Sequence, residues 1–340
     1  MNVTAMWPVV LPVFPLAVLL TWGMLRYAAR RNMIDVPGAR SLHTAPTPRG
    51  GGLAIAVCIL GGGAFLTVTD RIPGTLGMSL CAGGVIVAVF GWLDDRRGMP
   101  ARYRAAGYLI AAALGVWLSG GLPRVAVGAS ALELGWAGIP VAVLAIAWLT
   151  NLYNFMDGAD GIAAVQGISA GAFGAVLFGM GGQWGTATLC LILVAACAGF
   201  LIFNWPPARL FMGDVGSCLL GYSFGMLALY GERTGAAPLL AWWLLLLAFI
   251  VDASLTLALR MVRGEKWYSP HRTHAYQLLV QSGLGHRGLL LWFLLTNFMV
   301  LGPIALLARS GDALLMAVVI ATIAAAILWY RIQNRHGQFQ

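Results

Sequence analysis

Long apolar blocks separated by short polar strips form the main pattern along the chain. A helix needs about 20 mostly apolar residues to cross the hydrocarbon core of a membrane, and this window selects about eleven segments. They lie near 7–27, 52–69, 77–93, 105–120, 137–153, 161–180, 185–203, 213–230, 237–257, 288–308 and 313–331. The pattern predicts an all-α polytopic integral membrane protein, with residues 1–340 forming one multi-span domain.

The composition agrees with a membrane protein, since 60% of the 340 residues are hydrophobic and only 10% are charged. An ordinary soluble domain has about 25% charged residues. The formal net charge of +9 could indicate a nucleic-acid partner, but the basic residues lie at the ends of the apolar blocks, where a membrane surface explains them. We therefore expect no nucleic acid. Five cysteines fall inside apolar blocks and are expected to be small core residues.

The basic residues also predict an orientation. An odd number of spans, about eleven, places the two termini on opposite sides of the membrane. Of the 21 Lys and Arg residues, seventeen follow the odd-numbered spans: Arg26, Arg30, Arg31, Arg40, Arg49, Arg96, Arg97, Arg102, Arg104, Arg209, Arg260, Arg263, Lys266, Arg272, Arg287, Arg331 and Arg335. The positive-inside rule then puts the N terminus outside and the C terminus in the cytoplasm. The first span is expected to be retained, because its arginines follow the apolar stretch.

Carboxylates gather at the ends of the predicted spans on the cytoplasmic side. They are Asp94, Asp95, Asp157, Asp160 and Asp214, and all have apolar neighbours. Ionised groups in such positions are costly and need compensation. A divalent cation is the simplest candidate, and two or three carboxylates suit Mg²⁺, which shares its coordination shell with water and phosphate. The adjacent pair also has a plainer interpretation, in which the arginines that follow it neutralise it at the membrane interface.

Two glycine-rich motifs surround the other carboxylates. NLYNFMDGADGIA, residues 151–163, puts Asp157 and Asp160 three residues apart, and it lacks the alternating ligands and closing Glu of a calcium loop. In FNWPPARLFMGDVGS, residues 203–217, the prolines end one helix and Asp214 begins the next, where free backbone N–H groups can hold anions. Phe211 in this motif also has a simpler interpretation as an aromatic residue of the membrane interface.

Two basic motifs are candidates for phosphate binding. SLHTAPTPRGGG, residues 41–52, combines His43 and Arg49 with three glycines whose backbone could approach a phosphate closely. SPHRTHAYQ, residues 269–277, brings His271, Arg272 and His274 together. Zinc binding by the two histidines lacks a third nearby ligand, so phosphate contact is the preferred interpretation.

Four motifs together resemble one family. They are D-D after the third span, N-x-x-D-G-x-D-G after the fifth, F-N-x-x-P-A-x-x-F-M-G-D-x-G-S before the eighth and an R-x-H loop before the tenth. In this combination they resemble the polyprenyl-phosphate N-acetylhexosamine-1-phosphate transferases, over about residues 35 to 290. The resemblance implies an enzyme of the bacterial inner membrane that transfers N-acetylhexosamine-1-phosphate from a UDP-sugar to undecaprenyl phosphate and releases UMP. It also implies Mg²⁺ as cofactor, with Mn²⁺ as a substitute ion.

The resemblance assigns expected roles to residues of the motifs. Asp94 and Asp95 match the acidic pair tied to the metal and to activation of the lipid phosphate, and Asp214 matches the magnesium carboxylate. On the nucleotide side the matching residues are Asn154, Asp157, Asp160, Asn204 and Phe211, with Phe211 placed to stack on uracil. The catalytic histidine loop is matched by His274, with His271 and Arg272 near the diphosphate.

Departures from the family pattern bear on the branch. The peptidoglycan enzyme, phospho-N-acetylmuramoyl-pentapeptide transferase, typically has consecutive histidines where this chain reads HRTHAYQ. The difference favours an O-antigen or related initiating transferase. A multi-span secondary transporter would place its carboxylates near the bilayer midplane instead, and the motif of a CDP-alcohol phosphotransferase is absent. The sugar and the oligomeric state, with a homodimer among the options, are left open by the sequence.

Overall fold

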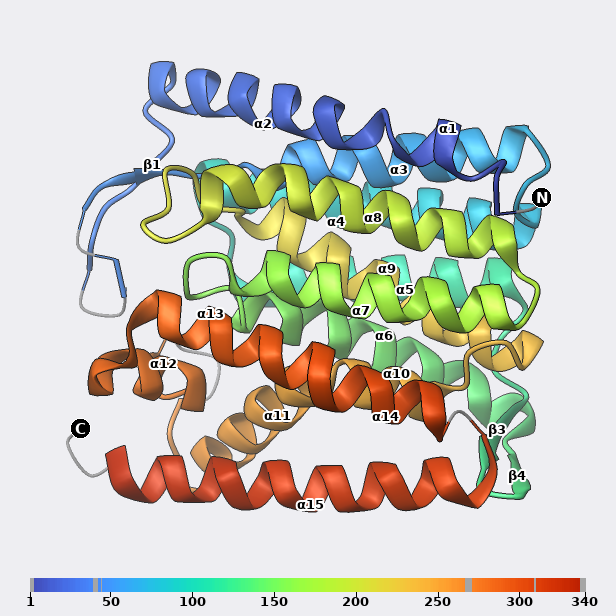
Figure 1. Ribbon diagram of the computed structural model, residues 1–340. Helices are drawn as coiled ribbons and strands as arrows, with labels where there is room; N and C mark the ends of the chain where they lie inside the picture. The colour runs from blue at the N-terminus through green and yellow to red at the C-terminus, as the bar shows by residue number, and fades with distance from the viewer. Residues whose placement is uncertain (1–2, 39–41, 44, 267–270, 309, 337–340) are drawn as a thin grey trace.

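The computed structural model describes residues 3–38, 42–43, 45–266, 271–308 and 310–336. The chain forms a bundle of long helices whose axes run between the same two ends (Figure 1). Helix α1 begins at one end, and α15 finishes at the other. In chain order the helices are α1 (Trp7–Val10), α2 (Val13–Arg30), α3 (Gly52–Val68), α4 (Gly74–Arg97), α5 (Ala101–Ser119), α6 (Gly138–Phe155), α7 (Ile162–Met180), α8 (Trp184–Asn204), α9 (Asp214–Thr234), α10 (Leu239–Leu245), α11 (Leu247–Val262), α12 (Ala275–Leu279), α13 (Gly285–Thr296), α14 (Gly302–Leu307) and α15 (Gly311–His336).

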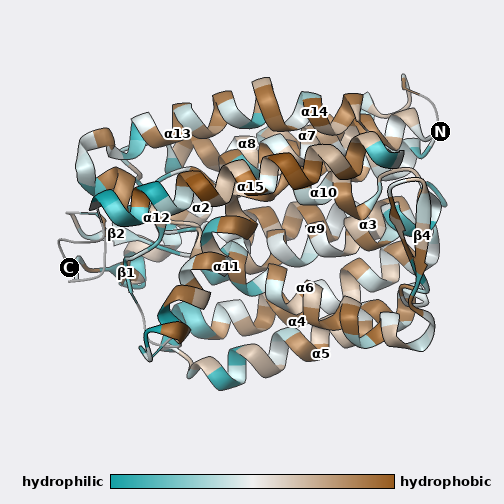
Figure 2. Ribbon diagram, turned by 90° about the horizontal axis from the view of Figure 1, so that it is seen from below, coloured by the Kyte–Doolittle hydropathy of each residue, from teal (hydrophilic) through white to brown (hydrophobic). Residues whose placement is uncertain are grey.

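Each apolar segment predicted from the sequence coincides with a helical segment of the structure. Hydrophobic residues cover the middle of the helices and hydrophilic residues gather toward the two ends (Figure 2). Among the described residues, seven helices are long and apolar enough to cross a membrane, or up to eight if the bent pair α10–α11 is one span. The all-α polytopic fold is therefore confirmed, while the count of about eleven spans stays a prediction.

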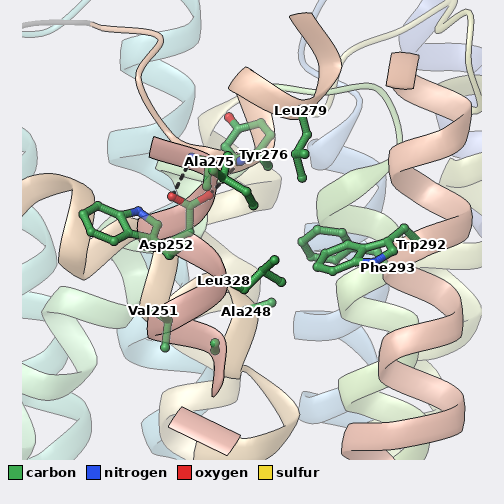
Figure 3. Close-up of a pocket in the computed structure, with 12 residues that line it drawn as sticks. Ala248, Val251, Asp252, Ala275, Tyr276, Leu279, Trp292, Phe293 and Leu328 are labelled. Atoms are coloured by element: carbon green, nitrogen blue, oxygen red, sulfur yellow. Dashed lines mark hydrogen bonds between the residues drawn. The ribbon is translucent and has the colours of Figure 1, made fainter. Parts of the chain in front are cut away.

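The ninth predicted span, 237–257, is broken in the structure. Helices α10 and α11 meet at Leu246 and are bent by 81°. The side chain of Gln166 on α7 donates a 2.7 Å hydrogen bond to the carbonyl of Leu245, beside the break, and Asn297 donates to Gln166 in turn. A broken helix is tolerated at membrane depth because such buried side chains satisfy its free backbone groups. Beyond the bend, Asp252 of α11 points toward the first turn of α12 (Figure 3).

Two small antiparallel sheets occur in the loops. Strands β1 (Ile34–Asp35) and β2 (Thr47–Pro48) pair between α2 and α3, and β3 (Arg124–Val127) pairs with β4 (Ser130–Glu133) between α5 and α6. The sequence indicated only loops there. These pairs of two and four residues per strand leave the helical fold class unchanged.

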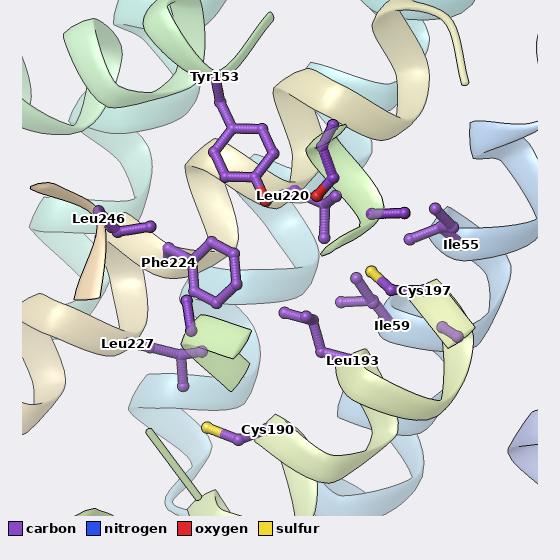
Figure 4. Close-up of a cluster of buried hydrophobic side chains, with 14 of the residues drawn as sticks. Ile55, Ile59, Tyr153, Cys190, Leu193, Cys197, Leu220, Phe224, Leu227 and Leu246 are labelled. Atoms are coloured by element: carbon purple, nitrogen blue, oxygen red, sulfur yellow. Dashed lines mark hydrogen bonds between the residues drawn. The ribbon is translucent and has the colours of Figure 1, made fainter. Parts of the chain in front are cut away.

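The core lies between α3, α6, α8 and α9, where Tyr153, Phe224 and Leu220 pack against residues of the neighbouring helices (Figure 4). Small residues let these helices approach closely: a Cβ added to Gly52 would lie 2.3 Å from the backbone nitrogen of Gly216. Close approach through small residues is how helices associate in membranes. The cysteines are free and buried or partly buried, as expected of core residues.

Candidate active site

A polar cavity of about 410 Å³ opens at the end of the bundle where α4, α6 and α8 finish and α7 and α9 begin. This end carries the loops that the sequence assigned to the cytoplasm. Most of the predicted site residues line the cavity: His43, Arg49, Asp95, Asn154, Asp157, Asp160, Asn204, Phe211, Asp214 and His271. Asp94, Arg272 and His274 do not line it. The structure thus brings together motifs that are up to 228 residues apart in the chain, as the interval from His43 to His271 shows.

Asp95 joins α4 to the start of α9. Its carboxylate accepts hydrogen bonds from the backbone nitrogens of Asp214, at 3.0 Å, and Val215, at 3.4 Å. A carboxylate at this position satisfies free N–H groups and interacts favourably with the helix dipole. Gly213 has φ +75°, and a Cβ there would lie 2.5 Å from Asp95 Oδ2, so only glycine allows this approach. Asp95 therefore fixes the position of Asp214 at the cavity wall.

Arg104 on α5 connects two of the carboxylates. Its Nη1 lies 2.7 Å from Asp94 Oδ2 and 3.2 Å from Asp214 Oδ2. The other oxygen of Asp214 accepts a 2.9 Å hydrogen bond from Asn154 Nδ2. The sequence analysis counted Arg104 only among the basic residues and did not assign it to the site. Its position in the first turns of an apolar helix was the available signal, because an arginine there needs an acidic partner.

The loop between α6 and α7 supplies a further carboxylate, that of Asp157. Asp157 lines the cavity, and among the described residues its side chain has no hydrogen bond. Burial raises the pKa of Asp157 well above its usual value, and the nearby carboxylates of Asp214, Asp95 and Asp160 raise this pKa further. A cation bound beside Asp157 would favour its charged form and lower this pKa again.

The carboxylates at the cavity supply only part of a Mg²⁺ coordination shell. Asp157 and Asp214 offer hard oxygen ligands at the wall of the same cavity. No group of three His, Cys, Asp or Glu side chains in the described part of the chain forms a ready ligand set. Asp94 and Asp95, expected as further ligands, are engaged with Arg104 and with the backbone of α9. Mg²⁺ commonly binds through one or two carboxylates and completes its shell with water and substrate phosphates, so the donor set fits.

Asp160 and Asn204 hold the surrounding loops together. Asp160 Oδ2 accepts a 3.0 Å hydrogen bond from the backbone nitrogen of Ala208, and Asn204 Oδ1 accepts one of 2.8 Å from Gly161. His286 of α13 accepts a 3.0 Å hydrogen bond at Nδ1 from the backbone nitrogen of Asp160 and also lines the cavity. His286 was missed in the sequence analysis, because it follows the recognised motifs and belongs to none of them.

The glycine turn before α3 has a different role from the one expected. Its backbone N–H groups donate to the carbonyls of Phe211 and Met212, at 2.8 Å for the bond between Gly52 and Met212. These donors are used by the protein and are not available to a phosphate, which corrects the prediction of close phosphate approach. The side chains of His43 and Arg49 still reach the cavity, and the His43 ring lies edge-on to Phe211 with centroids 4.9 Å apart.

The histidine loop is only partly at the cavity. Its first two residues, 269 and 270, lie outside the described residues. His271 lines the cavity, Arg272 is exposed, and His274 is buried. His274 Nδ1 lies 3.5 Å from Asp252 Oδ1, and the His271 and His274 rings are 4.8 Å apart. Contact of His274 with a substrate stays a prediction, since its neighbours are protein groups.

The arrangement suits transfer of a phosphoryl group. Carboxylates, an arginine and histidines surround a polar cavity at one end of the bundle. Such groups neutralise charge and position phosphates, which phosphoryl transfer needs more than it needs a protein nucleophile. A transporter would place these groups near the bilayer midplane, whereas here they lie at one end of the helical bundle.

Comparison with known proteins gives the family. Residues 77–232 match glycosyl transferase family 4. The chain is 31% identical over 280 residues to a probable undecaprenyl-phosphate N-acetylglucosaminyl 1-phosphate transferase of Bacillus subtilis, covering 80% of this chain and 76% of that protein. It is 32% identical over 340 residues to a decaprenyl-phosphate N-acetylglucosaminephosphotransferase of Mycobacterium tuberculosis, covering 88% and 83%. An undecaprenyl-phosphate alpha-N-acetylglucosaminyl 1-phosphate transferase of Escherichia coli is 26% identical over 303 residues, with 84% and 80% covered. The chain belongs to glycosyl transferase family 4, among the polyprenyl-phosphate N-acetylhexosamine-1-phosphate transferases.

Proposed function

We propose that the protein transfers N-acetylglucosamine-1-phosphate from UDP-N-acetylglucosamine to undecaprenyl phosphate. The sugar and the lipid are supported by the printed names of the relatives from Bacillus subtilis and Escherichia coli. None of the three relatives described above is named a pentapeptide transferase, which is consistent with the histidine loop of this chain. Initiation of O-antigen or a related envelope polysaccharide is the role that we propose for the product.

One observation carries the proposal: Arg104 lies between a polar cavity and an apolar one. The second cavity, of about 540 Å³, is lined by Arg102, Arg104, Trp148, Phe155 and Leu257, among others. Its apolar walls suit the isoprenoid chain, and its two guanidinium groups suit the lipid phosphate. Because Arg104 also contacts Asp214 in the first cavity, a lipid phosphate on Arg104 would face a UDP-sugar in the polar cavity.

The transfer needs no covalent enzyme intermediate. An oxygen of the lipid phosphate attacks the sugar-linked β-phosphorus, and the bond from that phosphorus to the bridging oxygen breaks. The electron pair leaves with UMP, so the products are undecaprenyl-pyrophosphate-N-acetylglucosamine and UMP. The attacking oxygen is already anionic. Arg104 therefore acts by orienting the lipid phosphate and reducing charge repulsion, and a base at Asp94 or Asp95 is optional.

Mg²⁺ is the proposed cofactor, with Mn²⁺ as a substitute. When bound, it would neutralise charge on the diphosphate and on the leaving UMP. Asp214 and Asp157 would hold it, and Asn154 would orient Asp214 through their 2.9 Å hydrogen bond. Phe211 would stack on the uracil, and His43 and Arg49 would close the same side of the cavity.

The membrane orientation is part of the proposal. The site faces the cytoplasm of a bacterial cell, the N terminus lies outside, and the C terminus lies inside. This placement is supported by the basic residues at the cavity end of the bundle. It also gives the site access to UDP-sugars, which are cytoplasmic metabolites.

The test is a transfer assay with purified protein in detergent. UMP release from UDP-N-acetylglucosamine is measured with and without undecaprenyl phosphate. The lipid product is extracted and identified by mass spectrometry. We expect UMP only when the lipid is present, and we expect EDTA to stop its release until Mg²⁺ or Mn²⁺ is restored. Equal release without the lipid, or release of UDP, contradicts the proposal. Parallel reactions with other UDP-N-acetylhexosamines test the choice of sugar.

A further inference from the structure

His286 stands at the junction of the polar cavity with a third cavity. The third cavity, of about 460 Å³, is lined by Thr47, Pro207, Leu284 and Arg287, among others. Five residues line both cavities: Leu42, His43, Asp160, Phe211 and His286. His286 therefore lines the same two cavities as Phe211, the ring proposed to stack on uracil.

The hydrogen bond at Nδ1 decides which ring nitrogen of His286 carries the proton. Nδ1 accepts a 3.0 Å hydrogen bond from the backbone N–H of Asp160, so this nitrogen must offer its lone pair. The same Nδ1 lies 3.5 Å from Asp160 Oδ1, which is too long for a good hydrogen bond. The backbone contact therefore fixes the neutral tautomer with the proton on Nε2. Among the described residues, the hydrogen bond of the His286 ring is the one at Nδ1, and none is formed at Nε2.

The surroundings hold the ring in this orientation. Asp160 is itself fixed by the backbone nitrogen of Ala208, at 3.0 Å. The next residue, Arg287, donates through Nε to the carbonyl of Pro206, at 3.1 Å. The side chain of His286 retains 19% of its exposure, so Nε2–H is an oriented donor at an accessible wall. A fixed donor of this kind gives specificity in a binding pocket.

We infer that His286 is a specificity-determining residue whose Nε2–H donates a hydrogen bond to a carbonyl oxygen of the uracil base. A neutral donor suits a neutral carbonyl oxygen, whereas the arginines and the carboxylate cluster suit the phosphates and the cation. His286 and Phe211 line both cavities, whereas Asp157 and Asp214 line only the polar one, so the donor is assigned to the base and not to the reacting phosphorus. The inference rests on the proposed function, because it takes a uridine nucleotide as the ligand.

Two variants separate the two nitrogens of the ring. In His286→Asn the amide oxygen can replace Nδ1 and accept from Asp160, while the donor at the Nε2 position is lost. In His286→Gln the amide nitrogen can replace Nε2 and donate, while the acceptor for Asp160 is lost. If His286 only holds the loop that contains Asp160, His286→Asn should bind UMP normally and His286→Gln should not. If His286 recognises uracil, His286→Gln should bind UMP normally and His286→Asn should not.

The measurement is the dissociation constant of UMP by titration calorimetry, with the melting temperature of each variant. We expect UMP to bind three- to tenfold more weakly to His286→Asn, which is the usual effect of one neutral hydrogen bond, and nearly normally to His286→Gln. Normal UMP binding by His286→Asn overturns the inference. So does a rise in the Michaelis constant for UDP-N-acetylglucosamine without any change in UMP binding, because the contact would then be with the sugar.

Thiocarbonyl analogues test the same contact in the wild-type protein, where folding of a variant is not in question. Sulfur is a weaker acceptor than oxygen, so either 2-thio-UMP or 4-thio-UMP should bind more weakly than UMP, and the deficit should vanish in His286→Gly or His286→Asn. Equal binding of UMP and both analogues to the wild type overturns the inference. UMP binding requires no turnover, so this result is independent of the transfer assay, and failure of that assay alone would count against the proposed function.

Discussion

Asp252 is expected to hold the histidine loop in place without contacting a substrate. Its carboxylate accepts hydrogen bonds from the backbone nitrogens of Ala275, at 2.8 Å, and Tyr276, at 3.0 Å, and from the hydroxyl of Thr256, at 3.0 Å. None of the sequence motifs includes this residue. The structure shows that it fixes the first turn of α12, directly after His274 (Figure 3).

The effect of Asp252→Asn follows from these contacts. The amide oxygen can still accept from Ala275 and Thr256, but the amide nitrogen would face the N–H of Tyr276, so one hydrogen bond is lost and a buried donor is unpaired. Loss of one charge-assisted bond and weakening of the others should lower the free energy of unfolding by roughly 2–4 kcal/mol. At about 2 °C per kcal/mol for a large chain, the melting temperature should fall by about 4–8 °C.

The assay is thermal unfolding in detergent together with transfer kinetics. The value of kcat/KM should also fall, because His271 and Gln277, on either side of this turn, line the polar cavity. Asp312→Asn is a matched control, since Asp312 also accepts a backbone N–H, from Ala129 at 2.9 Å, but lies exposed at the other end of the bundle. Complete loss of activity in Asp252→Asn with an unchanged melting temperature would refute a positioning role.

Three further predictions concern the cavity. Asp214→Asn should abolish turnover and leave the protein folded, because the amide loses the charge proposed to hold Mg²⁺; normal activity at saturating Mg²⁺ contradicts this. Phe211→Ala should raise the Michaelis constant for the UDP-sugar, because the lost stacking is worth roughly 1–3 kcal/mol, and should leave the Michaelis constant for the lipid unchanged. If Phe211 is only a residue of the membrane interface, the substitution should change only the melting temperature. Burial, and then electrostatic interaction with His274 and Arg260, lowers the pKa of His271 to about 4. Because this folded-state pKa lies below the unfolded value of about 6.5, the unfolded chain binds more protons than the folded one between these two values. The contribution of His271 to the free energy of unfolding is therefore fully present above about pH 6.5 and is lost as the pH falls toward 4. His271→Gln should reduce this loss, measured as melting temperature against pH.

The helical segments and the set of motifs could be identified from the sequence alone. A span of about 20 apolar residues is a local property, so the segments could be located without knowledge of their neighbours. Short loops and a membrane leave few arrangements, and motifs at the ends of spans on one side of the membrane had to meet at one end of the bundle. This is why Asn154, Asp157 and Asp214 were predicted as one site and line one cavity.

The tertiary structure decided which side chain faces which partner. Helices such as α3 and α4 are apolar on nearly all sides, so the sequence does not show how each is rotated about its axis. Rotation makes Asp95 a cap for α9, and it directs Arg104 between Asp94 and Asp214. The break at Leu246 likewise depends on side chains of other helices that satisfy its backbone. Contacts between elements distant in sequence, such as His286 with Asp160, leave no local pattern, and for that reason only the folded chain reveals them.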